Sequence, residues 1–165
     1  MASITLKGNP FSTSGDLPAV GSKAPAFDLR TVGHAQEDGS SFAGRKLVLN
    51  IFPSIDTGIC AQSVRTFNQH AAGRDDVAVL CISADLPFAH ARFCGAEGIE
   101  NVHSLSTFDS TFREDFGVKI LGGPLRGCCA RSVLVLDPDG TVLHAELVPE
   151  IVQEPDYAAA LAALT

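Results

Sequence analysis

Cys60 lies where a buried strand is expected to give way to a helix. The run from Lys46 to Phe52 is short and mostly apolar, as in a buried strand, and apolar residues recur at helical spacing from Cys60 to His70. The unpaired N–H groups and the positive dipole end of a helix start favour an anion. For a cysteine that anion is the thiolate, the nucleophilic form. Cys60 is therefore a candidate nucleophile.

Cys60 also fits a purely structural interpretation. It shares one helical face with Val64, Phe67 and Ala71, so its thiol would serve equally well as a small apolar core residue. The cysteine and its own helix do not decide between the two interpretations.

The residues before Cys60 complete a longer pattern. Pro53, Thr57 and Cys60 are spaced as proline, three residues, threonine, two residues, cysteine, which resembles the active-site signature of the peroxiredoxins. Within that superfamily, the chain closely resembles the bacterial thiol peroxidases. The similar segments follow the family's order along nearly the whole chain, at residues 50–60, 80–89, 92–98, 123–127 and 154–157.

The resemblance implies a fold and an activity. The implied fold is thioredoxin-like α/β, with a central mixed sheet flanked by helices and an N-terminal β-hairpin. The implied activity is reduction of hydrogen peroxide and organic hydroperoxides, with a preference for alkyl or lipid hydroperoxides. The resemblance also implies that no cofactor is needed, that thioredoxin is the reductant and that the enzyme is a homodimer. Attack on the peroxide would leave a sulfenic acid on Cys60, which a second thiol must capture before further oxidation.

Cys94 is the implied resolving cysteine. Residues 92–98 resemble the family segment that carries it, and it would form a disulfide with Cys60 within one chain. Periodicity alone does not distinguish Cys94 from Cys81, which lies in an apolar strand run and is expected to be an inert core thiol. A disulfide requires Cα atoms within roughly 7 Å. We therefore expect the helices that carry Cys60 and Cys94 to unwind locally on oxidation.

Three further residues have expected roles beside Cys60. Arg131 is the expected cation, because the resemblance places the active-site arginine shortly after residues 123–127. A guanidinium also suits this role, since it can donate to both the sulfur and a peroxide oxygen. The alternative is that Arg131 is an exposed arginine at the end of a strand. Thr57 would bond the thiolate and the peroxide, cap the helix N-terminus, or do both. Pro53 would shield the pocket from water.

Cys128 and Cys129 depart from the family pattern, in which small or aliphatic residues are usual. One interpretation is that both are modest apolar residues at a strand start. The other follows from strand alternation, which places Cys129 on the face of Arg131 and Cys128 on the opposite face. Cys129 would then approach the pocket as a secondary thiol.

The elements that would position these residues alternate along the chain. Residues 33–44 are expected to form an exposed loop, and Pro138-Asp139-Gly140 predicts a hairpin turn. Strands are expected near residues 4–6, 47–52, 77–83, 102–105, 131–137 and 141–148, and helices near 60–73, 87–97, 109–116 and 155–164. This order favours one thioredoxin-like domain over residues 1–165.

The composition narrows the functional classes. A chain of 165 residues with 45% hydrophobic residues fits one domain, and a formal charge of −7 argues against a nucleic-acid partner. The N-terminus lacks a signal-peptide pattern and no apolar run is long enough to span a bilayer, so a cytoplasmic protein without stable membrane association is expected. The five cysteines and five histidines show no metal-ligand spacing, so no metal site is expected.

Two other functions remain open at this point. A thiol–disulfide oxidoreductase on the same fold is disfavoured because Cys60 is followed by Ala61, Gln62 and Ser63 rather than by a C-x-x-C motif. A non-enzymatic peroxide sensor would use the same two cysteines, but each molecule would oxidise once instead of cycling.

Overall fold

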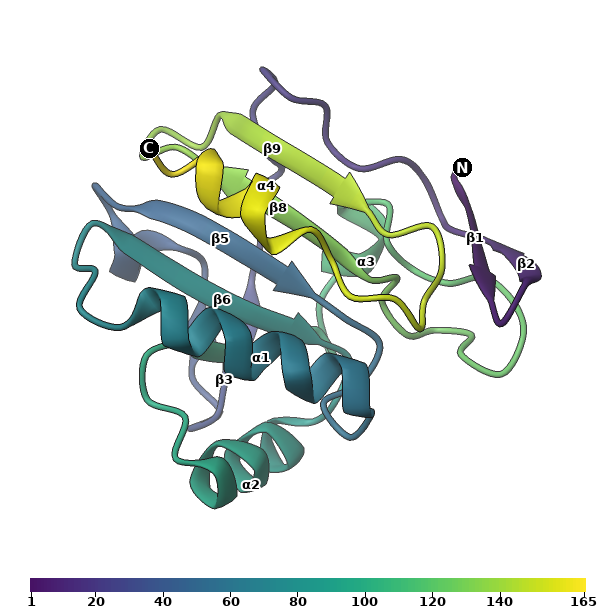
Figure 1. Ribbon diagram of the computed structural model, residues 1–165, viewed down its shortest axis with the longest axis horizontal. Coiled ribbons are helices and arrows are strands. Elements are labelled where there is room, and N and C mark those ends of the chain that lie inside the picture. The colour runs from purple at the N-terminus through teal and green to yellow at the C-terminus, as the bar shows by residue number, and fades with distance from the viewer.

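A seven-stranded mixed sheet forms the centre of the computed structural model, which describes residues 1–165 (Figure 1). The strands are β3 Leu29–Thr31, β4 Gln36–Glu37, β5 Lys46–Ile51, β6 Val77–Ser83, β7 His103–Ser106, β8 Ser132–Leu136 and β9 Val142–Leu147. Their order across the sheet is β4-β3-β7-β6-β5-β8-β9. The pairs β5–β6 and β6–β7 are parallel and the others are antiparallel, which confirms the predicted mixed sheet.

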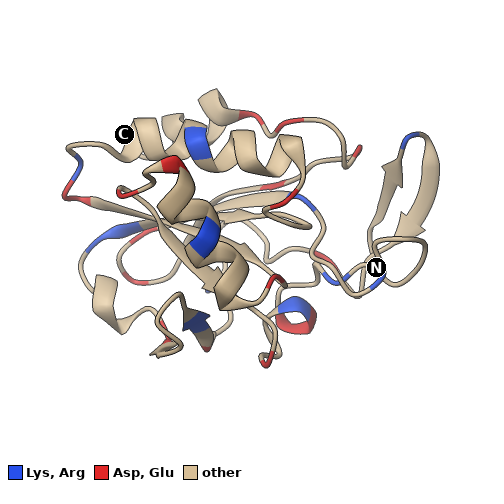
Figure 2. Ribbon diagram, turned by 90° about the horizontal axis from the view of Figure 1, so that it is seen from below, with Lys and Arg blue, Asp and Glu red and all other residues tan.

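The N-terminal residues form a separate hairpin, as predicted. β1 Ser3–Leu6 pairs with β2 Asn9–Ser12, and Figure 2 shows this hairpin standing away from the sheet and its helices. Its attachment to the rest of the chain includes two backbone hydrogen bonds, from Thr5 N to Pro149 O at 2.7 Å and from Ile151 N to Thr5 O at 2.8 Å.

Four helices accompany the sheet: α1 Gly58–Ala71, α2 Pro87–Glu97, α3 Phe112–Asp115 and α4 Tyr157–Ala162. The bounds of α2 agree with the prediction because Pro87 favours a first helical position and Gly98 ends the helix in the left-handed conformation, with φ of 64°. Figure 1 shows α1 and α4 together in front of the sheet and α3 behind it. No helix combines the length and apolar character that crossing a membrane requires.

Both faces of the central strands are buried. Val133 and Val135 of β8 belong to the same apolar cluster as Cys60 of α1, whereas Leu134 and Leu136 pack with Phe112 of α3 on the other face. A strand covered on both faces has apolar residues at successive positions, which is why β6 and β8 appear in the sequence as continuous apolar runs.

Three expectations about the elements require correction. Residues 33–44 are not simply an exposed loop, because they contain β4 and a 3-10 helix over Ser40–Phe42, and Phe42 is only 6% exposed in the core. The strand β3 was not predicted, since its three residues are too few to show an alternation. The strand expected from Arg131 begins one residue later, at Ser132.

Candidate active site

Cys60 lies in the first turn of α1 and is fully buried. Its neighbours in the apolar cluster include Val64 and Phe67, so the core interpretation describes part of its environment. Its sulfur nevertheless has a charged partner, because Arg131 Nη2 donates a hydrogen bond to Cys60 Sγ at 3.3 Å. Core packing and a charged hydrogen-bond partner therefore occur together at this residue.

Arg131 is a buried cation without a carboxylate partner. Its side chain is 2% exposed, none of the ion pairs in the structure includes it, and its Nε donates to the carbonyl oxygen of Ile151 at 2.9 Å. Burying an unpaired charge is costly, so a counter-charge beside it is strongly favoured. Of the two hydrogen-bond partners of Arg131, the Cys60 sulfur is the one that can carry a negative charge. Arg131 Nη1 is buried and has no hydrogen-bond partner, so one end of the guanidinium has an unsatisfied donor.

A cavity of about 450 Å³ lies next to this pair. Arg131 contributes to its lining, and so do Leu6 and Lys7 of the N-terminal hairpin. Most of the other lining side chains are apolar, and they come from the start of α1, the 124–125 segment and the loop after β9: Ile59, Pro124, Leu125, Ile151 and Val152. One buried cation among apolar walls suits a small ligand with a polar head and an apolar tail.

Pro53 and Thr57 lie on the same cavity as Arg131. Pro53 is buried, whereas Thr57 is exposed. The Thr57 hydroxyl donates to the carbonyl oxygen of Ser54 at 3.1 Å and makes no capping bond to α1, so the predicted capping by this side chain is wrong. The structure thus gathers Pro53, Thr57 and Arg131 around one cavity beside Cys60.

Cys94 lies in the C-terminal half of α2 and is half-buried. Its sulfur is 3.2 Å from the Ser104 hydroxyl of β7, and its side chain packs against the apolar cluster that contains Cys60. All five cysteines are free thiols in this structure. Cys60 and Cys94 therefore sit in two separate, intact helices of the reduced protein.

Comparison with known proteins places this chain in a family. A family model described as Redoxin matches residues 19–161. Thiol peroxidases of Mycobacterium bovis and Corynebacterium glutamicum are each 56% identical over 164 residues, which cover 99% of both chains. The chain belongs to the thiol peroxidase family. Among solved structures, a peroxiredoxin-like protein from Aquifex aeolicus superposes with a TM-score of 0.94 at 35% identity, covering 99% of this chain and 96% of that one.

Membership of the thiol peroxidases establishes the class of activity. The protein is an enzyme, a thiol-dependent peroxidase, on the thioredoxin-like fold of the peroxiredoxins. The family, fold and enzyme class expected from the sequence are thereby confirmed. The relatives support neither the thiol–disulfide oxidoreductase nor the sensor.

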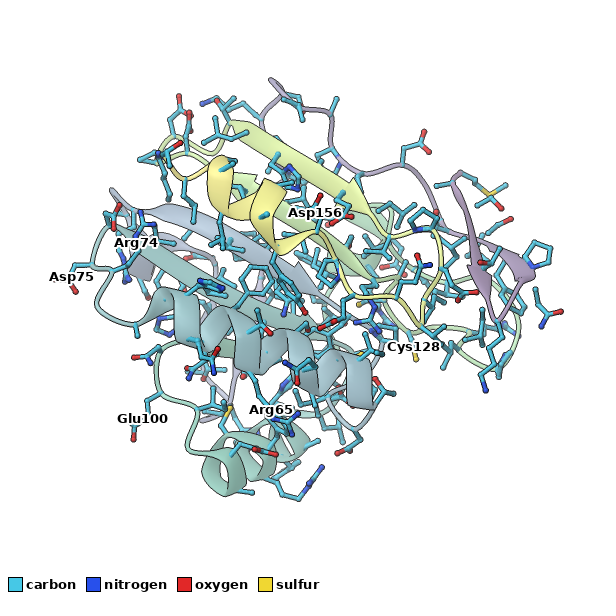
Figure 3. The ribbon with its side chains drawn as sticks, in the orientation of Figure 1. Arg65, Arg74, Asp75, Glu100, Cys128 and Asp156 are labelled. Carbon is cyan, nitrogen blue, oxygen red and sulfur yellow. The ribbon has the colours of Figure 1, made fainter.

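The remaining cysteines of this thiol peroxidase differ in their surroundings. Cys81 and Cys129 are fully buried, and burial raises the pKa of each thiol to about 12. Cys128 is half-buried, and burial is the main cause that raises its pKa as well. The nearby charges of Asp85 and Cys60 act in the same direction and contribute less. Figure 3 shows Cys128 on the side of the molecule where α1 begins.

Of the two interpretations of Cys129, the one that brings it to the pocket is wrong. Cys129 packs with Phe112 and Phe116 of the α3 face, whereas Arg131 reaches Cys60 on the α1 face. Strand alternation failed here because β8 begins only at Ser132, and Cys129 forms an isolated bridge with Lys119 instead.

Two residues that support the site were missed in the sequence. Ile151 holds Arg131 through its backbone carbonyl, which no side-chain pattern can reveal. Asp85 accepts hydrogen bonds from Ile55 N at 2.7 Å and from Ser54 Oγ at 2.8 Å, both on the segment that leads to Cys60. An available signal was the position of Asp85 just beyond the end of a buried parallel strand, next to the end of the strand that precedes Cys60.

Proposed function

We propose that this thiol peroxidase reduces hydrogen peroxide and organic hydroperoxides through a sulfenic acid on Cys60 and a Cys60–Cys94 disulfide, which thioredoxin reduces. The observation that carries the proposal is the contact between Arg131 Nη2 and Cys60 Sγ, made by a residue that also lines the cavity and whose Nη1 is buried without a partner. One guanidinium is thus placed to stabilise the thiolate and to bind a peroxide oxygen at the same time.

In the first step, the Cys60 thiolate attacks the terminal oxygen of the hydroperoxide. A sulfur–oxygen bond forms, the oxygen–oxygen bond breaks, and the alkoxide or hydroxide leaves and is protonated to an alcohol or water. Arg131 stabilises the negative charge as it moves from the sulfur to the departing oxygen. Pro53 and the apolar lining exclude water, and Thr57 faces the same cavity with a hydroxyl that can bond the peroxide.

In the second step, the Cys94 thiol attacks the oxidised sulfur of Cys60. A disulfide forms, and the sulfenic oxygen leaves as water with the thiol proton. Thiol–disulfide exchange with the two thiols of reduced thioredoxin then returns two electrons and restores both cysteines. Because both cysteines lie in helices of the reduced protein, this step requires local unwinding at the start of α1 and at the end of α2.

The lining of the cavity supports organic hydroperoxides as substrates. Apolar side chains from three segments surround the single buried cation, so an alkyl chain can lie against them while the peroxide group reaches Arg131. Hydrogen peroxide uses the same polar end of the cavity without filling its apolar part. Alkyl and lipid hydroperoxides are therefore the favoured class in this proposal.

We also propose that the enzyme is a homodimer of the cytoplasm. Large apolar side chains are exposed near the start of α2, with Phe88 at 69%, Leu86 at 48% and Phe108 at 49%. The Ser106 hydroxyl donates to the backbone carbonyl of Asp85, which brings the segment of Phe108 beside α2. Contiguous exposed apolar surface is typical of protein interfaces. The five free thiols and the proposed reductant both suit a reducing compartment.

Peroxide consumption coupled to thioredoxin and its reductase tests the catalytic cycle. Cys60→Ser removes the nucleophile, so turnover is expected to be lost, and Cys94→Ser is expected to leave one fast oxidation without turnover. Cys81→Ala is the matched control, because it removes a cysteine that the mechanism does not use. Full turnover by Cys60→Ser would contradict the mechanism, and full turnover by Cys94→Ser would assign the resolving role to another thiol.

A further inference from the structure

The carboxylate of Asp85 lies at the centre of a hydrogen-bond network outside the cavity. Asp85 follows β6 and precedes α2, and it accepts from Ile55 N at 2.7 Å, from Ser54 Oγ at 2.8 Å and from Ser83 Oγ at 2.5 Å. Ser54 and Ile55 belong to residues 52–57, here called the Cys60 loop, which connect β5 to α1. One side chain therefore holds the segment that positions the nucleophile.

The same network continues into α2 through a buried histidine. The Ser83 hydroxyl donates its only proton to the Asp85 carboxylate, so it accepts from its two other partners, Asp85 N at 3.2 Å and His90 Nε2 at 2.9 Å. His90 must then carry its proton on Nε2, and its Nδ1 is buried without a partner. His90 is 1% exposed, and burial lowers its pKa, as expected for a ring that stays neutral. Asp85 thus connects the Cys60 loop with the helix that carries Cys94.

Asp85 itself is fixed to the sheet. Its backbone carbonyl accepts from Ser106 Oγ at 2.5 Å, and the carbonyl of Ser83 accepts from Thr107 N at 2.9 Å. The end of β6 therefore stays with β7 when neighbouring segments move. Departure of the Cys60 loop must break the bonds that Ser54 and Ile55 make to the carboxylate, and these bonds favour the loop position in which Cys60 faces Arg131.

Other links between the same segments are exposed to solvent. Arg92 of α2 pairs with Asp56 of the Cys60 loop, with side chains 60% and 56% exposed. Arg65 of α1 pairs with Glu97 of α2 at 2.6 Å, and Figure 3 shows Arg65 between the two helices. Exposed ion pairs contribute little, whereas hydrogen bonds from a backbone amide and two hydroxyls to one half-buried carboxylate are charge-assisted and stronger. The Asp85 network is therefore the principal polar link.

We propose that Asp85 is a positioning residue that holds the Cys60 loop in the arrangement that reduces peroxide and opposes the rearrangement that forms the disulfide. The proposal rests on the Cys60–Cys94 cycle proposed above. It assigns opposite effects to the two steps. The peroxide step needs the bonded loop, because Cys60 must face Arg131, and the disulfide step needs the loop released from Asp85 so that Cys60 reaches Cys94.

The test follows both steps in one quenched-flow experiment on the full-length reduced chain. The protein is mixed with hydrogen peroxide and quenched with a thiol-alkylating reagent and dimedone, so that mass spectrometry counts thiol, sulfenic acid and disulfide. For Asp85→Asn, which keeps the shape of the side chain but loses its charge, the peroxide step is expected to slow about tenfold. The disulfide step is expected to proceed at the wild-type rate or faster.

Two further variants make the result specific. Ser54→Ala removes the bond to Asp85 and the bond that Asp56 N donates to the same hydroxyl, both on the loop side. The peroxide step is expected to slow about threefold with the disulfide step again not slowed, so the test stands if Asp85→Asn does not fold. Glu97→Gln breaks the exposed Arg65 pair between the helices and serves as the matched control, with both steps within about twofold of wild type.

The possible outcomes separate this proposal from the catalytic cycle. If the wild type forms no Cys60–Cys94 disulfide, the proposed function itself is wrong. If the wild type completes both steps and Asp85→Asn and Ser54→Ala match it in both, the positioning role alone is overturned. Equal slowing of both steps, or the same loss in Glu97→Gln, also overturns it, because general destabilisation would then explain the effect.

Discussion

Cys60 and Cys129 are both fully buried cysteines, yet their surroundings differ in the features that determine reactivity. Cys60 has a guanidinium nitrogen 3.3 Å from its sulfur and lies beside a cavity. Cys129 lies against the aromatic rings of the α3 face, and burial raises its pKa to about 12. Burial is therefore common to both thiols. What separates the two residues is the buried guanidinium of Arg131 beside Cys60 and the cavity that Arg131 lines.

Removing the cation is expected to give the largest effect. Arg131→Gln leaves Cys60 buried without a counter-charge, which makes its surroundings similar to those of Cys129. The kcat/KM for hydrogen peroxide is expected to fall about 10²- to 10³-fold, as for the loss of one preorganised donor at a developing negative charge. Steady-state peroxide consumption measures it, with the exposed Arg126→Gln as the control. A loss smaller than about tenfold would contradict the assigned role.

A change in the cavity tests the second difference between the two thiols. Leu125→Ala removes part of the apolar wall and enlarges the cavity. The KM for tert-butyl hydroperoxide is therefore expected to rise about fivefold, while kcat/KM for hydrogen peroxide stays within about twofold. Leu121→Ala is a matched control, because Leu121 is 43% exposed and does not line the cavity. Equal effects on both substrates would show that the apolar wall does not select them.

The core position of Cys129 predicts a change in stability without a change in activity. Cys129→Ala removes a buried sulfur, which is expected to lower the free energy of unfolding by about 1 kcal/mol. Urea unfolding followed by circular dichroism measures this loss, and peroxidase activity is expected to stay within about twofold of wild type. A marked loss of activity in folded Cys129→Ala protein would restore this residue as a functional thiol.

The smallest expected effect concerns His90, a buried histidine that is linked through Ser83 to the Asp85 network and must stay neutral. Burial lowers its pKa below the ordinary value near 6.5, although Asp85 and Asp56 act in the opposite direction. Between the lowered pKa and 6.5 the unfolded chain binds more protons than the folded chain. The stability contributed by neutral His90 is therefore complete above about pH 6.5 and is lost as the pH falls below it.

His90→Gln keeps a donor that can reach Ser83 and removes the titration. The difference in unfolding free energy between about pH 7.5 and about pH 5.5 is expected to shrink by roughly 1 kcal/mol or less. Urea unfolding at the two pH values measures it. An unchanged or larger difference would show that His90 is not the group that titrates.

The sequence was most informative where a local rule determines the structure. Pro87 and Gly98 mark the ends of α2 because each favours a particular backbone conformation at a helix terminus. The spacing of Pro53, Thr57 and Cys60 identified two residues that line the cavity and the cysteine that lies beside it, since all three lie at one junction between a strand and a helix. Arg131 came from family resemblance rather than from any local rule.

The sequence was least informative where contacts between distant segments determine the result. Alternation placed Cys129 on the wrong face because an isolated bridge to Lys119 interrupts the chain before β8. The bonds from Ser54 and Ile55 to Asp85 join residues about thirty positions apart, and no periodicity encodes them. Likewise, no pattern shows that the backbone of Ile151 orients Arg131.

The N-terminal hairpin has a consequence for how this enzyme can evolve. Leu6 and Lys7 form one wall of the cavity, but the hairpin lies outside the main sheet. The backbone of Ile151 holds the hairpin through its N–H to Thr5 and holds Arg131 through its carbonyl. Because these attachments use backbone atoms, the side chains of Leu6 and Lys7 can vary without removing them. Substrate preference can therefore diverge among descendants of this chain while the reactive centre is inherited unchanged.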